Sequence, residues 1–253
     1  MESNFRKDKE IKFGMDNKNG CQTGRTAPLI RAAIFGTSRS GKDYTINDAQ
    51  ELLRDKGMDF KHVSPIHLVH QELKGQRLRD MTADDKSRLV EKVRSMIEEQ
   101  TRGASAFIDE HYSFPEKCGG VVIDNGYYGE KLPYYREPGD EGRLYEVVFC
   151  DEWIKQYDLA VYMEIDPDVI LERFRTSEGD KYNPFITAED VRLWQLFELE
   201  RIQYICNLYK VPLFYIYDHT KSGDEMAMII FHYLKIRDKM EQQNDIPETL
   251  CGD

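Results

Sequence analysis

One short stretch near the start of the chain limits local structure more than any other: residues 30–44 read IRAAIFGTSRSGKDY. An apolar run ends at Gly36, four residues follow, and Gly41 and Lys42 begin a segment with the spacing of an amphipathic helix. Glycine adopts backbone conformations that other residues avoid, so such a loop can turn successive N–H groups toward one point. The first turn of the following helix adds unpaired N–H groups and the positive end of its dipole. The stretch therefore predicts a strand, a phosphate-binding loop and a helix, in that order.

The end of this loop carries the expected cation and one departure from the usual pattern. Lys42 is placed to reach the β- and γ-phosphates of a nucleotide as a point charge. The next position usually holds Ser or Thr, whose hydroxyl contacts Mg²⁺, and here it holds Asp43. A carboxylate also suits a hydrated Mg²⁺, but it brings negative charge close to the phosphates. The alternative is a glycine-containing turn that only joins strand to helix, and the coincidence of strand, glycines and lysine favours phosphate binding.

The segment from Gly36 to Asp43 resembles the phosphate loop of small P-loop kinases of the nucleoside-monophosphate-kinase-like group. Its Gly-Lys-Asp ending is similar to that of phage-type deoxynucleoside monophosphate kinases and animal-type phosphomevalonate kinases. The resemblance implies ATP and Mg²⁺ as cofactors and a three-layer α/β fold, in which a five-stranded parallel sheet of order 2-3-1-4-5 has helices on both faces. The residues that it implies for the nucleotide are Gly36, Thr37, Ser38, Arg39, Ser40, Gly41, Lys42, Asp43 and Tyr44.

The order of predicted elements extends this reading over residues 29–240. Strands are predicted near 59–64, 104–108, 159–165 and 212–217, alternating with helices at about 42–56, 65–100, 167–174, 188–210 and 222–234. Such alternation implies a parallel sheet covered on both faces. We interpret the polar residues 1–28 as a flexible N-terminal tail and residues 241–253 as a C-terminal tail. A Gly- and Tyr-rich insert is expected at about 115–146 and a short, polar lid at about 175–187.

Polar residues follow the predicted strand at 104–108, where open α/β sheets bind ligands. Asp109 occupies the place that nucleotide kinases fill with a carboxylate near Mg²⁺ or the acceptor. Asp43 and Asp109 are therefore the candidate metal residues. His111 and Tyr112 are candidates for lining the acceptor pocket. The alternative for Asp109 is a cap of the following turn.

Several arginines are candidates for binding phosphoryl groups. Arg77 and Arg79 lie between the helices of 65–100, which in the resembling kinases cover the phosphate of the acceptor. Arg173 and Arg175 approach the lid, where arginines of such kinases hold the transferring group. Because these two arginines are two residues apart on a helix, they project to different sides, and only one of them can point straight at the γ-phosphate. Arg173 is the first choice for that role and Arg175 the second. Arg192 follows the lid and is a further candidate. For each of them the alternative is an ordinary surface arginine.

The insert is less informative. Asn125 and Gly126 follow a short apolar run and predict a hairpin turn. Its tyrosines, Tyr127, Tyr128, Tyr134 and Tyr135, could stack on a base or pack the loop onto the body of the protein.

Composition narrows the classes of partner. Among 253 residues, Asp and Glu outnumber Lys and Arg by 46 to 35, which disfavours broad binding to nucleic acid or anionic membranes. A local basic cleft is still compatible with this charge. The five cysteines have no close spacing, which favours reduced thiols and a cytoplasmic location. No apolar run is long enough to span a membrane, and the chain is expected to act as a monomer or homodimer.

Together these features predict ATP-dependent transfer of a phosphoryl group to a small phosphorylated acceptor, a nucleoside or deoxynucleoside monophosphate. Lys42, Asp109, Arg173 and Arg175 are the candidate catalytic residues, since such transfer depends on positioning and charge. One alternative is a kinase for polynucleotide ends or modified DNA bases. Another is a non-catalytic nucleotide-binding switch or partner module.

Overall fold

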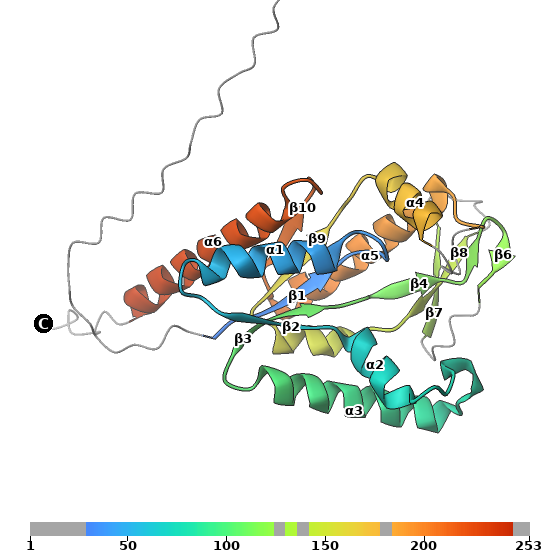
Figure 1. Cartoon of the computed structure of the whole chain (residues 1–253), viewed down its shortest axis with the longest axis horizontal. Helices are drawn as coiled ribbons and strands as arrows, with labels where there is room; N and C mark the ends of the chain where they lie inside the picture. Colours follow the sequence, from blue (N-terminus) through green and yellow to red (C-terminus); the bar gives the residue numbers. More distant parts are fainter. Residues whose placement is uncertain (1–28, 124–129, 136–141, 178–183, 245–253) are drawn as a thin grey trace, which may run out of the picture.

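The computed structural model describes residues 29–123, 130–135, 142–177 and 184–244, with side chains to residue 240. Its centre is a five-stranded parallel sheet (Figure 1) of order β10-β9-β1-β3-β2. Counted along the chain among these five strands, the order is 2-3-1-4-5, as the resemblance implies. The strands are β1 (Arg31–Phe35), β2 (Phe60–Val63), β3 (Ser105–Asp109), β9 (Leu159–Met163) and β10 (Leu213–Ile216). The expected α/β class and sheet order are confirmed.

Helices cover both faces of this sheet. The helices are α1 (Lys42–Arg54), α2 (Pro65–Leu73), α3 (Ala83–Thr101), α4 (Pro167–Thr176), α5 (Ala188–Tyr209) and α6 (Ser222–Asn244). Short 3-10 turns occur at Leu78–Asp80 and Asp151–Gln156. Helices α1 and α6 pack together on one face (Figure 1). Contacts of Lys61 with the end of α3, and of Tyr215 with α5, place those two helices on the other face. None of the helices in the described part of the chain is long and apolar enough to cross a membrane.

The pattern of burial explains why these segments form a sheet. Strands β1 and β9 are buried along almost their whole length, as expected for central parallel strands. Strand β2 lies at the edge, with Phe60 and Val63 buried and Lys61 exposed. His62 contacts Asp43 on α1 and Lys61 contacts the end of α3, so by the alternation of side chains in a strand Phe60 also faces α1 and Val63 faces α3.

The insert forms its own small antiparallel sheet. Strands β4 (Ser113–Pro115), β8 (Arg143–Val147) and β7 (Glu130–Tyr134) pair in that order. A ribbon of β5 (Lys117–Cys118) and β6 (Val121–Val122) turns at Gly119 and Gly120, both with positive φ. The turn expected at Asn125 and Gly126 lies outside the described residues, as do Tyr127 and Tyr128. The insert sheet packs on α5, where the Tyr145 and Phe197 rings stack with centroids 4.4 Å apart.

Two boundaries differ from the sequence predictions. Helix α6 continues to Asn244, so the segment interpreted as a C-terminal tail from residue 241 begins as helix. Strand β4 begins at Ser113, so the insert sheet takes in residues before position 115. The expected N-terminal tail and residues 178–183 of the expected lid lie outside the described residues.

Candidate functional site

The loop between β1 and α1 is a tight turn that leads directly into the helix. Gly41 caps α1 with φ 96° and ψ 22°, a left-handed conformation that favours glycine. A Cβ atom at Gly41 would lie 2.9 Å from the Arg173 guanidinium, so a side chain there would require Arg173 to move. Within the loop the Ser40 N–H donates to the Thr37 carbonyl at 3.2 Å. The loop therefore depends on glycine at position 41 chiefly for its backbone conformation.

Lys42 lies across this loop and is buried. Its Nζ donates to the Gly36 carbonyl at 2.7 Å and lies 3.5 Å from Asp109 Oδ1. Both side chains are almost fully buried, 5% and 6% exposed. Burial raises the pKa of Asp109, and the Lys42 charge opposes that rise. The end of β3 and the start of α1 thus bring a cation and a carboxylate together at one edge of the sheet.

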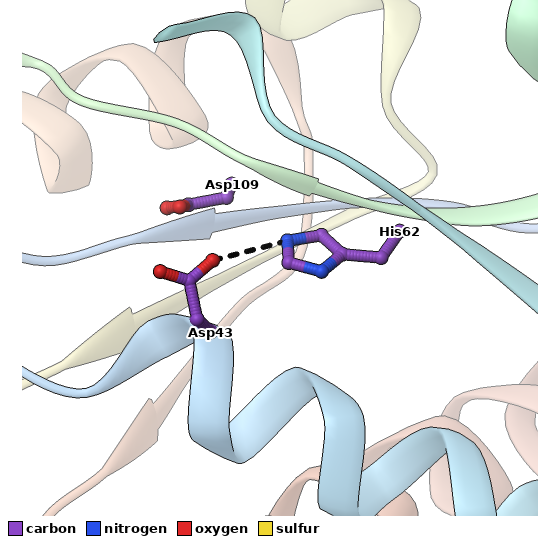
Figure 2. Close-up of side chains that lie close together, drawn as sticks. All are labelled: Asp43, His62 and Asp109. Carbon is purple, nitrogen blue, oxygen red and sulfur yellow. Dashed lines mark ion pairs between the residues drawn. The ribbon is translucent and has the colours of Figure 1, made fainter. Parts of the chain in front are cut away.

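A histidine that the sequence analysis did not single out joins them. His62, near the end of β2, directs its Nε2 atom toward Asp43 in the first turn of α1, at 3.5 Å from Oδ1 (Figure 2). Asp43, His62 and Asp109 each offer one ligand atom, and these atoms all lie within 4.8 Å of one another. The sequence did carry a signal: a polar residue near the end of a parallel strand lies at the ligand-binding edge.

Arg173 on α4 approaches the loop from another side. Its Nη1 donates to the carbonyl oxygens of Arg39 and Ser40 at 3.0 and 2.7 Å. Arg175 is exposed and does not line the cavity beside the loop. Their positions follow from helix geometry, since residues two apart point to different sides.

The loop borders a cavity of about 840 Å³ that opens to solvent. One group of its lining residues comes from the loop, α1 and α4, and it includes Ser38, Lys42, Tyr44 and Arg173. A second group comes from α2, from Leu78 and from the segment after β3: Ser64, Ile66, His67, His70, Leu78, His111 and Phe114. His219 and Ser222, before and at the start of α6, complete the lining. A volume of this size lies within the range of small-molecule binding sites in proteins.

Several buried polar atoms around this cavity make no hydrogen bond within the described residues. They are Thr37 Oγ1, Ser40 Oγ, His62 Nε2, Ser64 Oγ, Asp109 Oδ1 and His111 Nδ1. A buried polar group without a partner costs free energy, and native proteins leave few of them unsatisfied. Their concentration at one edge of the sheet indicates that the site is completed by solvent or a bound ligand.

The candidate acceptor residues divide into two groups. His111 lines the cavity, and burial together with the nearby Lys42 charge lowers its pKa well below the usual value. Tyr112 is fully buried on the other side of the chain, where its hydroxyl donates to Asp151 at 2.9 Å and accepts from Arg201 at 3.0 Å. Tyr112 therefore does not line the cavity that His111 lines, because consecutive extended residues point to opposite sides.

The three remaining arginine candidates lie outside the cavity. Arg77 is exposed and forms a bidentate pair with Asp80, and its neighbour Arg79 is also exposed. Between them, Leu78 contacts the cavity. Arg192 pairs with Glu189, one turn away on α5, at 2.6 Å. The structure thus leaves all three as surface arginines in the arrangement that it describes.

A buried ion pair behind the site was also missed. Arg94 on α3 donates to both carboxylate oxygens of Glu110 at 2.6 and 3.2 Å. Its guanidinium lies 3.7 Å from the centroid of the Trp153 ring. Glu110 directly follows Asp109, so this pair fixes the chain at the point where the site carboxylate and His111 emerge from β3. Nothing local in the sequence links positions 94 and 110.

Comparison with known proteins finds only distant similarities. No protein-family model matches the chain, and no curated protein matches it. Among solved structures, shikimate kinase from Bacteroides thetaiotaomicron has a TM-score of 0.45 and 11% identity, covering 80% of this chain and 99% of that one. Shikimate kinase from Acinetobacter baumannii in complex with shikimate has a TM-score of 0.45 and 12% identity, covering 87% of this chain and 97% of that one. A sugar kinase from Janibacter sp. HTCC2649 has a TM-score of 0.43 and 12% identity, covering 83% of this chain and 96% of that one. These similarities are too low for any substrate or residue role to be transferred.

Proposed function

We propose that this chain is an ATP-dependent phosphotransferase that moves the γ-phosphate to a small phosphorylated acceptor, a nucleoside or deoxynucleoside monophosphate. The observation that carries the proposal is the arrangement at the loop. A buried lysine, a left-handed glycine cap, an arginine from α4 and a carboxylate from β3 meet at one end of a solvent-open cavity. That set of groups provides what phosphoryl transfer requires, namely positioning and positive charge.

Each residue has a role that its position supports. Lys42 would exchange the Gly36 carbonyl for the β- and γ-phosphate oxygens. Arg173, now on loop carbonyls, lies where it can turn toward the transferring group and stabilise its developing charge. Asp43 and Asp109 offer the oxygen ligands that suit a divalent ion, which would neutralise the triphosphate. His219 and Ser222 would border the adenine end of the nucleotide.

The acceptor would occupy the part of the cavity lined by α2 and the segment after β3. Its walls combine imidazoles, His67, His70 and His111, with the apolar surface of Ile66 and Phe114. Such a lining suits a planar base beside an anionic group, because imidazoles donate hydrogen bonds and the Phe114 ring offers a stacking face. The choice of a nucleoside monophosphate rests further on the resemblance of the loop from Gly36 to Asp43.

The test is transfer of labelled γ-phosphate from ATP to a panel of nucleoside monophosphates, deoxynucleoside monophosphates, nucleosides and DNA ends. We expect transfer to a monophosphate by the wild-type protein and none by Lys42→Ala, with an unchanged circular dichroism spectrum. Lys56→Ala is the matched control, since Lys56 is exposed beyond the far end of α1. Full activity of Lys42→Ala, or transfer to DNA ends alone, would contradict the proposal. Tight ATP binding without transfer to any acceptor would assign the chain to non-catalytic nucleotide binding.

A further inference from the structure

Three chain segments that are distant in sequence converge at one edge of the sheet. In the strand register, His62 pairs with Phe107, two positions before Asp109, so both side chains lie on the face that α1 covers. Asp43 projects from the first turn of that helix (Figure 2). The convergence therefore follows from the fold itself.

The ligand atoms have spacings that suit a single ion. Two atoms each about 2.1 Å from one metal lie roughly 3 Å apart at a right angle and about 4.2 Å apart on opposite sides. His62 Nε2 and Asp43 Oδ1 are 3.5 Å apart, inside this range. The widest separation in the set is at most 4.8 Å, which a small side-chain rotation would close.

Two of the three atoms have charged neighbours at 3.5 Å, Lys42 for Asp109 and Asp43 for His62, but make no hydrogen bond within the described residues. Asp109 is 5% exposed, and its Oδ1 makes no hydrogen bond within the described residues. His62 Nε2 is likewise buried without a hydrogen bond in that part of the chain. Both are aimed into the space beside Asp43 (Figure 2). The Asp43 carboxylate is 64% exposed and can rotate to meet them.

Charge also favours a cation here. Two carboxylates lie beside a loop that would hold a triphosphate, and Lys42 is the cation nearest to Asp109, at 3.5 Å. A triphosphate would draw Lys42 toward its own oxygens and leave the two carboxylates facing more negative charge. A divalent ion between them removes that repulsion.

We propose that Asp43, His62 and Asp109 bind one divalent ion of the first transition series, preferring Mn²⁺ to Mg²⁺. The preference comes from the donor set. Mg²⁺ favours all-oxygen coordination and keeps much of its water, imidazole nitrogen suits the later ions of the first transition series, and Mn²⁺, which carboxylates also suit, lies between them. The inference deepens the proposed function, because the ion would lie beside the phosphate loop and take the place that Ser or Thr helps to define in the usual pattern.

The experiment uses the full chain and Mn²⁺ alone, without nucleotide or acceptor. Binding is measured by calorimetry and by the loss of the free-ion EPR signal, with Mg²⁺ as competitor. Pulsed EPR then reports whether a nitrogen is bound directly to the manganese. The wild-type protein is expected to bind Mn²⁺ at least tenfold more tightly than Mg²⁺ and to show nitrogen coupling.

His62→Gln replaces the nitrogen ligand by an amide oxygen. It should weaken Mn²⁺ binding by about tenfold or more, abolish the nitrogen coupling and bring the two ions close to equal affinity. Asp43→Asn should weaken the binding of both Mn²⁺ and Mg²⁺. Because the Asp43 side chain is exposed, this variant leaves the core intact. His232→Gln, an exposed histidine on α6, is the matched control and should bind like wild type.

Nitrogen coupling that persists in His62→Gln, or an unchanged preference between the ions, would overturn the proposal. So would unaltered Mn²⁺ binding in Asp43→Asn. Because no nucleotide is present, these outcomes are independent of phosphoryl transfer. Failure of the transfer assay with Lys42 intact would refute the proposed function and leave a measured manganese site in place.

Discussion

Arg173 makes contacts that hold it at the phosphate loop before any ligand arrives. Its guanidinium donates to two loop carbonyls, and it is the group that an added Cβ atom at Gly41 would contact. Loop carbonyls are acceptors that phosphate oxygens can replace, since charge-assisted bonds to phosphate are stronger than bonds to neutral carbonyls. Arg173 therefore combines a structural contact in the free protein with a proposed role in the transition state.

The first prediction concerns this arginine. Arg173→Ala should lower kcat by about 100-fold or more, because a donor aimed at developing charge is lost. Arg173→Lys should recover only part of that activity, since an ammonium lacks the planar fork. Arg175→Ala should cost less than about tenfold, because the cavity is not lined by Arg175.

Steady-state kinetics with the acceptor found in the transfer screen measures these effects. Arg88→Ala, which removes an exposed arginine on α3, is the control for a change in charge. Equal losses for Arg173→Ala and Arg175→Ala would mean that the assignment of Arg173 is wrong.

Single site residues could be predicted from the sequence where they directly follow a predicted strand, because strand ends form the ligand-binding edge of the sheet. Lys42 and Asp109 could each be placed at the ligand-binding edge because a loop and a strand end share that edge of the sheet. The position of His62 near a strand end also indicated that edge, but its distance from Asp43 and Asp109 depends on the register of β2 against β3, which no local pattern supplies. Arg77 and Arg192 each pair with an acidic residue three positions away, and residue type alone does not predict whether an arginine makes such a pair or binds a ligand.

Among the secondary-structure elements, the loop and α1 act as one unit whose geometry depends on Gly41. The second prediction is that Gly41→Ala weakens ATP binding by at least tenfold. A Cβ at φ 96° is strained by roughly 1–2 kcal/mol, and it also displaces Arg173.

Calorimetric titration with ATP and thermal unfolding measure the effect of Gly41→Ala. Gly57→Ala is a matched control after the other end of α1, where φ is +77° and no atom lies within 4 Å of an added Cβ. It should show the backbone strain in its stability and keep wild-type ATP affinity. Weaker ATP binding by both variants to the same extent would show that strain alone explains the result.

The long elements could be predicted and the insert could not, for a physical reason. Helices α3 and α5 carry caps at Thr82 and Thr187 that the sequence marks, and central strands read as apolar runs. Strands β4, β7 and β8 are three to five residues long, and β4 pairs with β8 although the other insert strands lie between them in sequence, so no local pattern gives their register. Gly119 and Gly120 form the turn between β5 and β6, and the turn predicted at Asn125 and Gly126 lies outside the described residues.

Over the whole molecule, the buried carboxyl group of Glu198 is one of the contacts that join the insert to the central sheet and its helices. Glu198 on α5 is fully buried and accepts hydrogen bonds from the Ser113 N–H and hydroxyl of β4 at 3.0 and 3.2 Å. Burial raises the pKa of Glu198 to about 7, and the bonds from Ser113 and the charge of Lys42 limit the rise. Ionisation of this group near neutral pH therefore places a buried charge at the contact between insert and core.

The last prediction follows from the sign of that shift. A folded-state pKa above the unfolded value means that the folded protein holds the proton more tightly, so Glu198 favours folding at low pH. Its contribution is present below the unfolded value of about 4.5 and is lost as pH rises to about 7, at about 1.4 kcal/mol per pH unit. The glutamine in Glu198→Gln cannot ionise. The free energy of unfolding of this variant, relative to that of wild type, should therefore rise by a few kcal/mol between pH 4.5 and pH 7.

Urea unfolding of both proteins at pH 5 and pH 8 measures this difference. His111, whose lowered pKa acts in the opposite direction, is present in both proteins and cancels. Glu200→Gln, an exposed change on the same helix, should keep the wild-type dependence. The same dependence on pH in Glu198→Gln and wild type would show that Glu198 stays ionised in the core. Because Ser113 lies four residues after Asp109, that result would place a permanent negative charge behind the site and require a cation to balance it.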